Sequence, residues 1–282
     1  MEYFPRTTVE NVSVSRMLIG INWFLGYSHT SAAKDAFIRE YQTRERLGEI
    51  LKTFMKAGVD TVYGIRPESP HLLAAIQDAE QATGRKAITI ALPTFDTSDT
   101  PQAWDANARM CDAQAKIGAT FCLPHQATTD AWMNRITRKI THMDRLVKLI
   151  RERGMVPGLS THTPEVPVYA DESGLDVATY IQIYNPLGFL MQIEIDWVHR
   201  MIWNCKKPVI VIKPMAAGRC LPIVGLGFVW GTIRDQDMVC VGTMLPDEAK
   251  ELVEISTALL ERRKSGVVLQ RTRSKESVEL KK

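Results

Sequence analysis

The chain has 282 residues, 45% of them hydrophobic, and a formal net charge of +3 at pH 7. The apolar content is sufficient for one large core, and the near-balanced charge gives no general attraction to nucleic acid. The five cysteines are widely spaced and form no C-x-x-C pair, which argues against a disulfide scaffold and against a zinc ribbon.

The sequence also predicts the cellular location of the protein. It has no basic-then-apolar leader at its start and no run near the ~18 apolar residues of a membrane span. We therefore expect a cytoplasmic protein that has neither a membrane nor nucleic acid as a partner. Its expected partner is a small-molecule substrate, and the sequence leaves the formation of a homo-oligomer open.

Eight short apolar segments follow one another along the chain. They are rich in Val, Ile and aromatic residues, as strands buried on both faces should be. The segments cover residues 16–24, 59–65, 87–93, 119–124, 155–160, 177–185, 208–214 and 237–243. We predict that each contains one strand.

Amphipathic segments separate these strands. Several begin at a Ser-Pro or Thr-Pro pair or end at a glycine, which are the usual start and stop signals of a helix. The predicted helices cover residues 43–58, 69–84, 100–118, 143–154 and 245–264.

The alternation of strands and helices predicts an α/β fold, a parallel eight-stranded (β/α)8 TIM barrel, as a single domain over residues 1–265. A doubly wound sheet is the alternative, but residues 21–35 lack the Gly-rich phosphate loop that usually follows its first strand. Residues 27–43 are predicted to form an insertion near the barrel mouth. Residues 266–282 are predicted to form a charged C-terminal tail.

The site of such a barrel lies where the strands end, so the polar residues that follow the strands are its candidates. The candidates for catalysis are Tyr63, Glu68, His125 and Lys213. The candidates for substrate binding are Asn22, Arg66, Ser160, Tyr184 and Asn185. In this interpretation His125 and Glu68 act as acid and base, and Lys213 anchors an anionic or carbonyl group. Lys213 could also form a Schiff base if burial lowers its pKa.

Three histidines lie just beyond strand ends and suggest a second form of the site. A predicted ligand set for a divalent metal consists of His29, His125, His162 and Asp96, with Glu68 as an alternative carboxylate. Zinc, manganese or iron would accept such ligands and keep a position open for water or substrate. The sequence leaves the metal-assisted and the metal-free site open.

Four segments, taken in order, resemble the aldo/keto reductase family. They are "VSVSRMLIGINWF" (12–24), "IRERGMVPGLSTHTPEVPVYADESGLDVATYIQIYNPL" (150–187), "KPVIVIKPMAAGRCL" (207–221) and "DMVCVGTMLPDEAKELVEI" (237–255). The resemblance implies the barrel fold and hydride transfer from a nicotinamide cofactor by an Asp, Tyr, Lys and His tetrad. Ser160 and Lys213 resemble cofactor-side positions of the family.

The sequence departs from the tetrad of that family. Tyr63 stands at the Asp position, and Glu68 stands at the Tyr position. Pro93 falls on or beside the Lys position, and His125 matches the His. The family's reduction needs a phenol whose proton is made available by a neighbouring lysine and histidine. The chain therefore resembles a divergent member that lacks most of the tetrad.

Three functions remain as hypotheses. The first is an enzyme for a small carbonyl- or sugar-like metabolite, with lyase, isomerase or hydrolase chemistry and with or without a divalent metal. The second is an NAD(P)-dependent oxidoreductase of the aldo/keto reductase type with an altered site, with NADP as its cofactor and Tyr63 as a rearranged acid. The third is a non-catalytic barrel that binds a ligand.

Overall fold

The computed structural model describes residues 3–278. Within this range, nine parallel strands form one sheet in the order β10-β11-β12-β13-β3-β4-β5-β6-β9. The strands are β3 (Met17–Gly20), β4 (Thr61–Ile65), β5 (Ile88–Ala91), β6 (Phe121–Cys122), β9 (Val156–Pro157), β10 (Leu159–Ser160), β11 (Tyr180–Ile183), β12 (Val209–Ile212) and β13 (Met238–Val241).

The two ends of this sheet are consecutive in the chain. Only Gly158 separates β9, which pairs with β6, from β10, which pairs with β11. A Cβ atom at Gly158 would lie 2.8 Å from both Leu123 and Thr179, so glycine is needed at this break. β9 and β10 together occupy the fifth strand position and close the sheet. The eight positions confirm the predicted (β/α)8 barrel.

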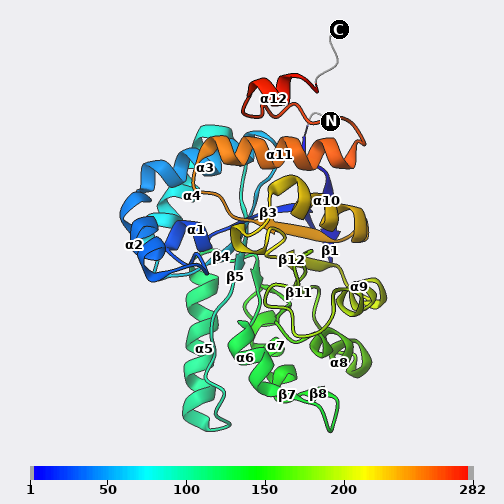
Figure 1. The fold of residues 1–282 in the computed structure, drawn as a ribbon. Coiled ribbons are helices and arrows are strands. Elements are labelled where there is room, and N and C mark those ends of the chain that lie inside the picture. The colour runs from blue at the N-terminus through cyan, green and yellow to red at the C-terminus, as the bar shows by residue number, and fades with distance from the viewer. Residues whose placement is uncertain (1–2, 279–282) are drawn as a thin grey trace.

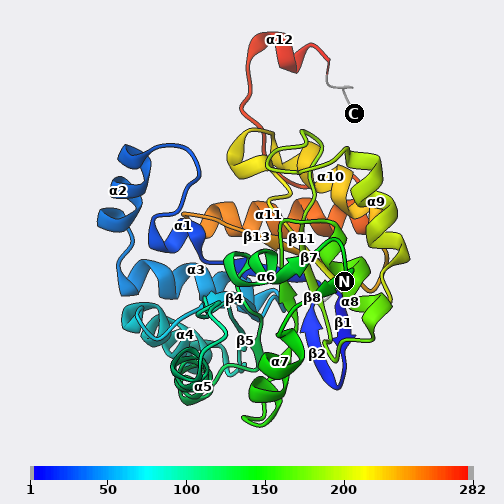
Figure 2. The same ribbon diagram turned by 90° about the horizontal axis from the view of Figure 1, so that it is seen from below.

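Each strand position is followed by a helix on the outside of the barrel (Figure 2). These helices are α3 (Arg44–Lys56), α4 (Pro70–Thr83), α5 (Pro101–Lys116), α7 (Met143–Arg151), α8 (Glu165–Ser173), α9 (Ile195–Asn204), α10 (Pro222–Thr232) and α11 (Pro246–Leu260). The hydroxyls of Thr43 and Thr100 accept N–H groups in the first turns of α3 and α5. Such caps satisfy donors that have no partner within the helix.

Further elements are added to this barrel (Figure 1). They are the hairpin β1 (Arg6–Val9) and β2 (Val12–Ser15), the helices α1 (Asn22–Leu25), α2 (Ala32–Tyr41) and α6 (Gln126–Trp132), the hairpin β7 (Met133–Asn134) and β8 (Lys139–Ile140), and α12 (Arg273–Glu276). α2 lies in the predicted insertion, whereas α6 and its hairpin were not predicted. The domain boundaries remain a prediction, and residues 279–282 of the predicted tail lie outside the described residues. No helix in residues 3–278 is long and apolar enough to cross a membrane.

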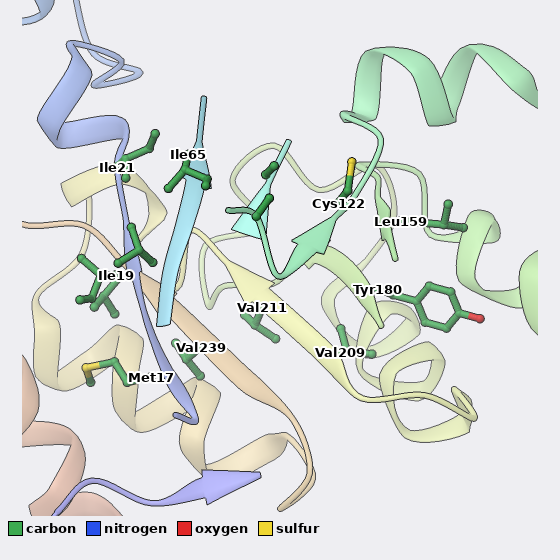
Figure 3. Packing of buried hydrophobic residues seen from close by; sticks show 14 of the residues in the cluster. Met17, Ile19, Ile21, Ile65, Cys122, Leu159, Tyr180, Val209, Val211 and Val239 are labelled. Carbon is green, nitrogen blue, oxygen red and sulfur yellow. The ribbon is translucent and has the colours of Figure 1, made fainter. Parts of the chain in front are cut away.

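The strands separate two apolar cores because successive side chains point to opposite faces. Leu18 and Ile210 belong to the core inside the barrel. Met17, Ile19 and Val211 belong to the core between the strands and the helices, part of which Figure 3 shows. Burial of each such side chain contributes about 1.5–3 kcal/mol. The strands that position the residues at the rim of the barrel are therefore packed on both faces.

Candidate functional site

A cavity of about 1070 Å³ lies at the carboxyl ends of the strands. In the described chain, every strand position except that of β11 contributes residues to its lining. The cavity brings together nine of the residues predicted from the sequence: Asn22, His29, Tyr63, Arg66, Glu68, His125, Ser160, His162 and Lys213.

Two predicted substrate-binding residues, Tyr184 and Asn185, follow β11 and do not line the cavity. Tyr184 points outward, where its hydroxyl donates to the Thr232 Oγ1 of α10 at 3.1 Å. The buried side chain of Asn185 accepts the Phe189 N–H at 2.9 Å and donates to the carbonyl oxygen of the same residue. The structure therefore assigns Tyr184 to the outer core and Asn185 to a loop, and neither lines the cavity.

The predicted metal site is not assembled. Asp96 is exposed and accepts the Ser98 N–H at 2.9 Å, and it does not line the cavity. Among residues 3–278, no three His, Cys, Asp or Glu side chains are grouped closely enough to hold a metal ion. His29, His125 and His162 share the cavity with Glu68, but within residues 3–278 these side chains do not form such a group. In the part of the chain that the structure describes, the predicted ligand set is therefore not assembled.

Lys213 ends β12 inside the cavity. Its backbone has a φ of +57°, in the left-handed region that costs a lysine about 1–3 kcal/mol. Its side chain is partly buried, and within residues 3–278 its Nζ has neither a hydrogen-bond partner nor an ion-pair partner. Burial lowers the pKa of Lys213 to about 8. Lys213 thus combines a strained backbone with a side-chain amine that has no partner in the described residues.

His125 follows β6 and caps α6. Its Nδ1 accepts the Ala127 N–H at 3.3 Å, so the neutral ring carries its proton on Nε2. Burial lowers the pKa of His125, and the positive charges of Arg66 and Lys213 lower it further. At neutral pH the imidazole is therefore uncharged and can donate a hydrogen bond from Nε2.

The other two cavity histidines are held uncharged by the same effects. Burial lowers the pKa of His162 to about 4, with further contributions from Lys213, His125 and His29. Burial and the charge of Lys213 also lower the pKa of His29, although Asp35 opposes this effect. No carboxylate contributes to the pKa values of His162, His125 or Lys213. The charged side chains that lower the pKa values of His125 and His162 are therefore all basic.

Tyr63 lies on an irregular part of β4. The register shifts between Tyr63 and Ile65, where Gly64 has a φ of +105°. Bulges of this kind redirect side chains near functional sites. Burial raises the pKa of Tyr63, the nearby Cys240 raises it further, and a hydrogen bond with Ser160 opposes these effects. Tyr63 therefore retains its proton at neutral pH.

Several lining residues were not predicted from the sequence: Trp23, Tyr27, Arg219, Glu248 and Glu251. Arg219 donates to the His29 carbonyl oxygen at 3.0 Å and lies 4.0 Å from the centre of the Phe189 ring. It therefore joins two loops over the cavity. A search of the strand-to-helix loops for aromatic and arginine residues would have included Arg219, Trp23 and Tyr27.

Comparisons with known proteins agree with this fold. No protein-family model and no curated protein sequence match the chain. A Pseudomonas aeruginosa protein assigned as an aldo-keto reductase matches in structure with a TM-score of 0.64, at 14% identity over 92% of this chain and 95% of that chain. An aldo/keto reductase from Klebsiella pneumoniae, solved in complex with NADP and acetate, has a TM-score of 0.55 at 15% identity, over 94% and 92% of the two chains.

A glycerol dehydrogenase from Gluconobacter oxydans has a TM-score of 0.55 at 10% identity, with 95% of this chain and 98% of that chain covered. The chain therefore has the barrel fold found in aldo-keto reductases. Identities of 10–15% show the fold alone, because one fold supports many chemistries.

Proposed function

We propose that this chain is an NADP-dependent oxidoreductase that interconverts the carbonyl and alcohol forms of a small oxygenated compound. The observation that carries this proposal is the joint presence of His125 and Lys213 in one cavity. The neutral imidazole of His125 is a hydrogen-bond donor, and the side chain of Lys213 is an amine without a partner in the described residues. Structural neighbours that are reductases or dehydrogenases support the same class of enzyme.

The side of the cavity near β12, β13 and α11 fits a phosphate-bearing dinucleotide. Thr243 is 3% exposed, and within the described residues its Oγ1 has no hydrogen-bond partner. Arg219 forms no ion pair within residues 3–278, so its guanidinium can bind a phosphate. Glu251 can accept hydrogen bonds from ribose hydroxyls. Bound there, the nicotinamide group would supply the hydride for the carbonyl carbon.

The carbonyl oxygen must gain a proton during reduction, and Lys213 is the best donor in the cavity. With a pKa of about 8, it is mostly protonated at pH 7 and still able to release the proton. Tyr63 holds its proton more tightly because burial raises its pKa. The Nε2–H of His125 can orient the carbonyl oxygen. We therefore assign the acid to Lys213 rather than to Tyr63.

NADPH fluorescence titration tests the proposal, together with rates measured on a panel of small aldehydes and oxo acids. Wild type and Lys213→Met should both bind NADPH, while the variant should reduce its best carbonyl substrate at least about 100-fold more slowly. Lys86→Met is the control, because Lys86 is exposed and pairs with Glu80 away from the cavity. Absence of NADPH binding at high micromolar concentration would defeat the proposal.

A second candidate function is a lyase or isomerase that uses Lys213 as a nucleophile. The unpaired amine and the neutral His125 and His162 favour it. The Lys213 nitrogen would attack a substrate carbonyl carbon, water would leave, and an imine would form. Borohydride treatment in the presence of glyceraldehyde should then label Lys213 in the wild-type protein. Labelling together with absent NADPH binding would favour this function over the first.

A further inference from the structure

Besides Lys213 and Arg219, a third cation without an ion-pair partner in residues 3–278, Arg66, lines the cavity. It follows β4, is partly buried, and its guanidinium lies 5.4 Å from the centre of the Tyr27 ring. Glu68 is only two residues away, yet it forms no ion pair with Arg66. Within residues 3–278 no other carboxylate does so either. Arg66 therefore presents free N–H groups to the cavity.

Arg66 lies close to the groups that we assign to the carbonyl. Its charge and that of Lys213 both act on His125, so these two cations and the imidazole border one space. Glu248 and Glu251 also line the cavity, but they contribute nothing to the pKa values of His125 and Lys213. Partly buried cations without a counterion are costly, and a bound anion would supply the missing partner.

We infer that the substrate is a carbonyl compound with an oxyanion a few bonds from its carbonyl, and that Arg66 binds this oxyanion. A guanidinium can donate two parallel N–H groups to a carboxylate or a phosphate. Because Arg66 and His125 line the same cavity and the guanidinium charge acts on the imidazole, a 2-oxo acid or a short phosphorylated aldehyde is the class of substrate that we infer. The inference rests on the proposed function, which assigns the carbonyl to His125 and Lys213.

Calorimetric titrations of the full chain with oxamate, inorganic phosphate and the neutral acetamide test the inference. Oxamate stands for a carboxylate substrate and phosphate for a phosphorylated one, so the tighter ligand identifies the oxyanion. We expect that acetamide does not bind. We also expect that Arg66→Gln lowers the affinity for the anion by about tenfold or more.

Arg46→Gln is a matched control. Its guanidinium also lies over a tyrosine ring, 3.9 Å from the centre of Tyr41, but it does not line the cavity. This variant should bind the anion as the wild type does. Thermal unfolding of both variants checks that they fold.

Three outcomes would overturn the inference. These are equal anion affinity in Arg66→Gln and wild type, absence of binding of either anion to the wild type, and a loss of NADPH affinity in Arg66→Gln. The last outcome would assign Arg66 to the cofactor instead. Failure of the wild type to bind NADPH would defeat the proposed function, while the effect of Arg66 on oxamate or phosphate affinity would still be measurable.

Discussion

The charged residues at the two ends of the barrel differ in whether they have partners within the fold. At the amino end, the fully buried Asp237 accepts from Arg234 at 2.7 Å and from the Val209 N–H at 2.8 Å. Arg16 is also buried and donates to the carbonyl oxygens of Asp237 and Arg234. Asp60 accepts from Arg6 at 2.7 Å. These charges all have partners within the fold.

At the carboxyl end, Lys213 and Arg66 have no ion-pair partner within the described residues, and burial lowers the pKa of Lys213. Paired charges at the amino end stabilise the barrel. Unpaired charges at the carboxyl end reduce stability and are available to a ligand. The difference matches the division of (β/α)8 barrels into a stability face and a functional face.

The largest effect should come from breaking a pair at the amino end. Asp237→Ala would leave the guanidinium of Arg234 without its counterion and the Val209 N–H without its acceptor. Loss of one partner of a buried pair typically costs about 3–5 kcal/mol. Urea unfolding at pH 7 measures this loss.

Asp235→Ala is the control for this experiment. Its carboxylate is fully exposed and lies 3.7 Å from Arg16. Since exposed ion pairs contribute little, this variant should unfold at nearly the wild-type urea concentration. Equal losses in the two variants would show that burial of the pair is not what matters at this end.

An intermediate effect should appear when the unpaired amine is removed. Between pH 8 and pH 10 the unfolded chain keeps a proton on Lys213 that the folded chain has lost, because only the folded pKa is lowered. Folding stability due to this group therefore rises with pH across this interval, by about 2 kcal/mol. Lys213→Met should lack the rise.

Urea unfolding of both proteins at pH 8, 9 and 10 tests this expectation. Other titrating groups, such as Tyr63 and the cysteines, are present in both proteins, so their contributions cancel in the difference. If the stability of Lys213→Met changed with pH in the same way as that of the wild type, the amine would be paired or solvated in the folded protein.

The barrel could be predicted from the sequence because its signal is local. Each strand is a short apolar run, and each of the predicted helices has its own start or stop residues. The break of the fifth strand at Gly158 was not visible, because it depends on how closely Leu123 and Thr179 approach the backbone. The hairpin after α6 was missed because its strands have only two residues each.

The site was predicted only in part, for a related reason. The rule that polar residues at strand ends face the mouth found His125, His162 and Lys213. It failed at Tyr184, because it ignored the direction in which the residue after β11 points. The sequence also could not show that Lys213 and Arg66 lack partners, since this depends on side chains from several strands.

The smallest effects should come from two threonines at opposite ends of the barrel. Thr61 is fully buried at the amino end, where its Oγ1 accepts from the Ser15 N–H at 3.2 Å and from the Ser15 hydroxyl at 3.0 Å. Thr61→Val should cost about 1 kcal/mol, because it leaves the Ser15 N–H without its acceptor, while the Ser15 hydroxyl can still donate to the Met17 carbonyl oxygen at 2.7 Å. Thr243 is also buried, but its Oγ1 has no partner in the described chain.

Thr243→Val should therefore leave stability nearly unchanged or raise it slightly, because the hydroxyl that it removes forms no hydrogen bond within the fold. In the proposed function this hydroxyl contacts the dinucleotide, so the same variant should weaken NADPH binding by about fivefold. Urea unfolding and NADPH titration of both variants separate the two roles. Equal destabilisation by the two substitutions would show that Thr243 supports the fold and would remove it from the cofactor site.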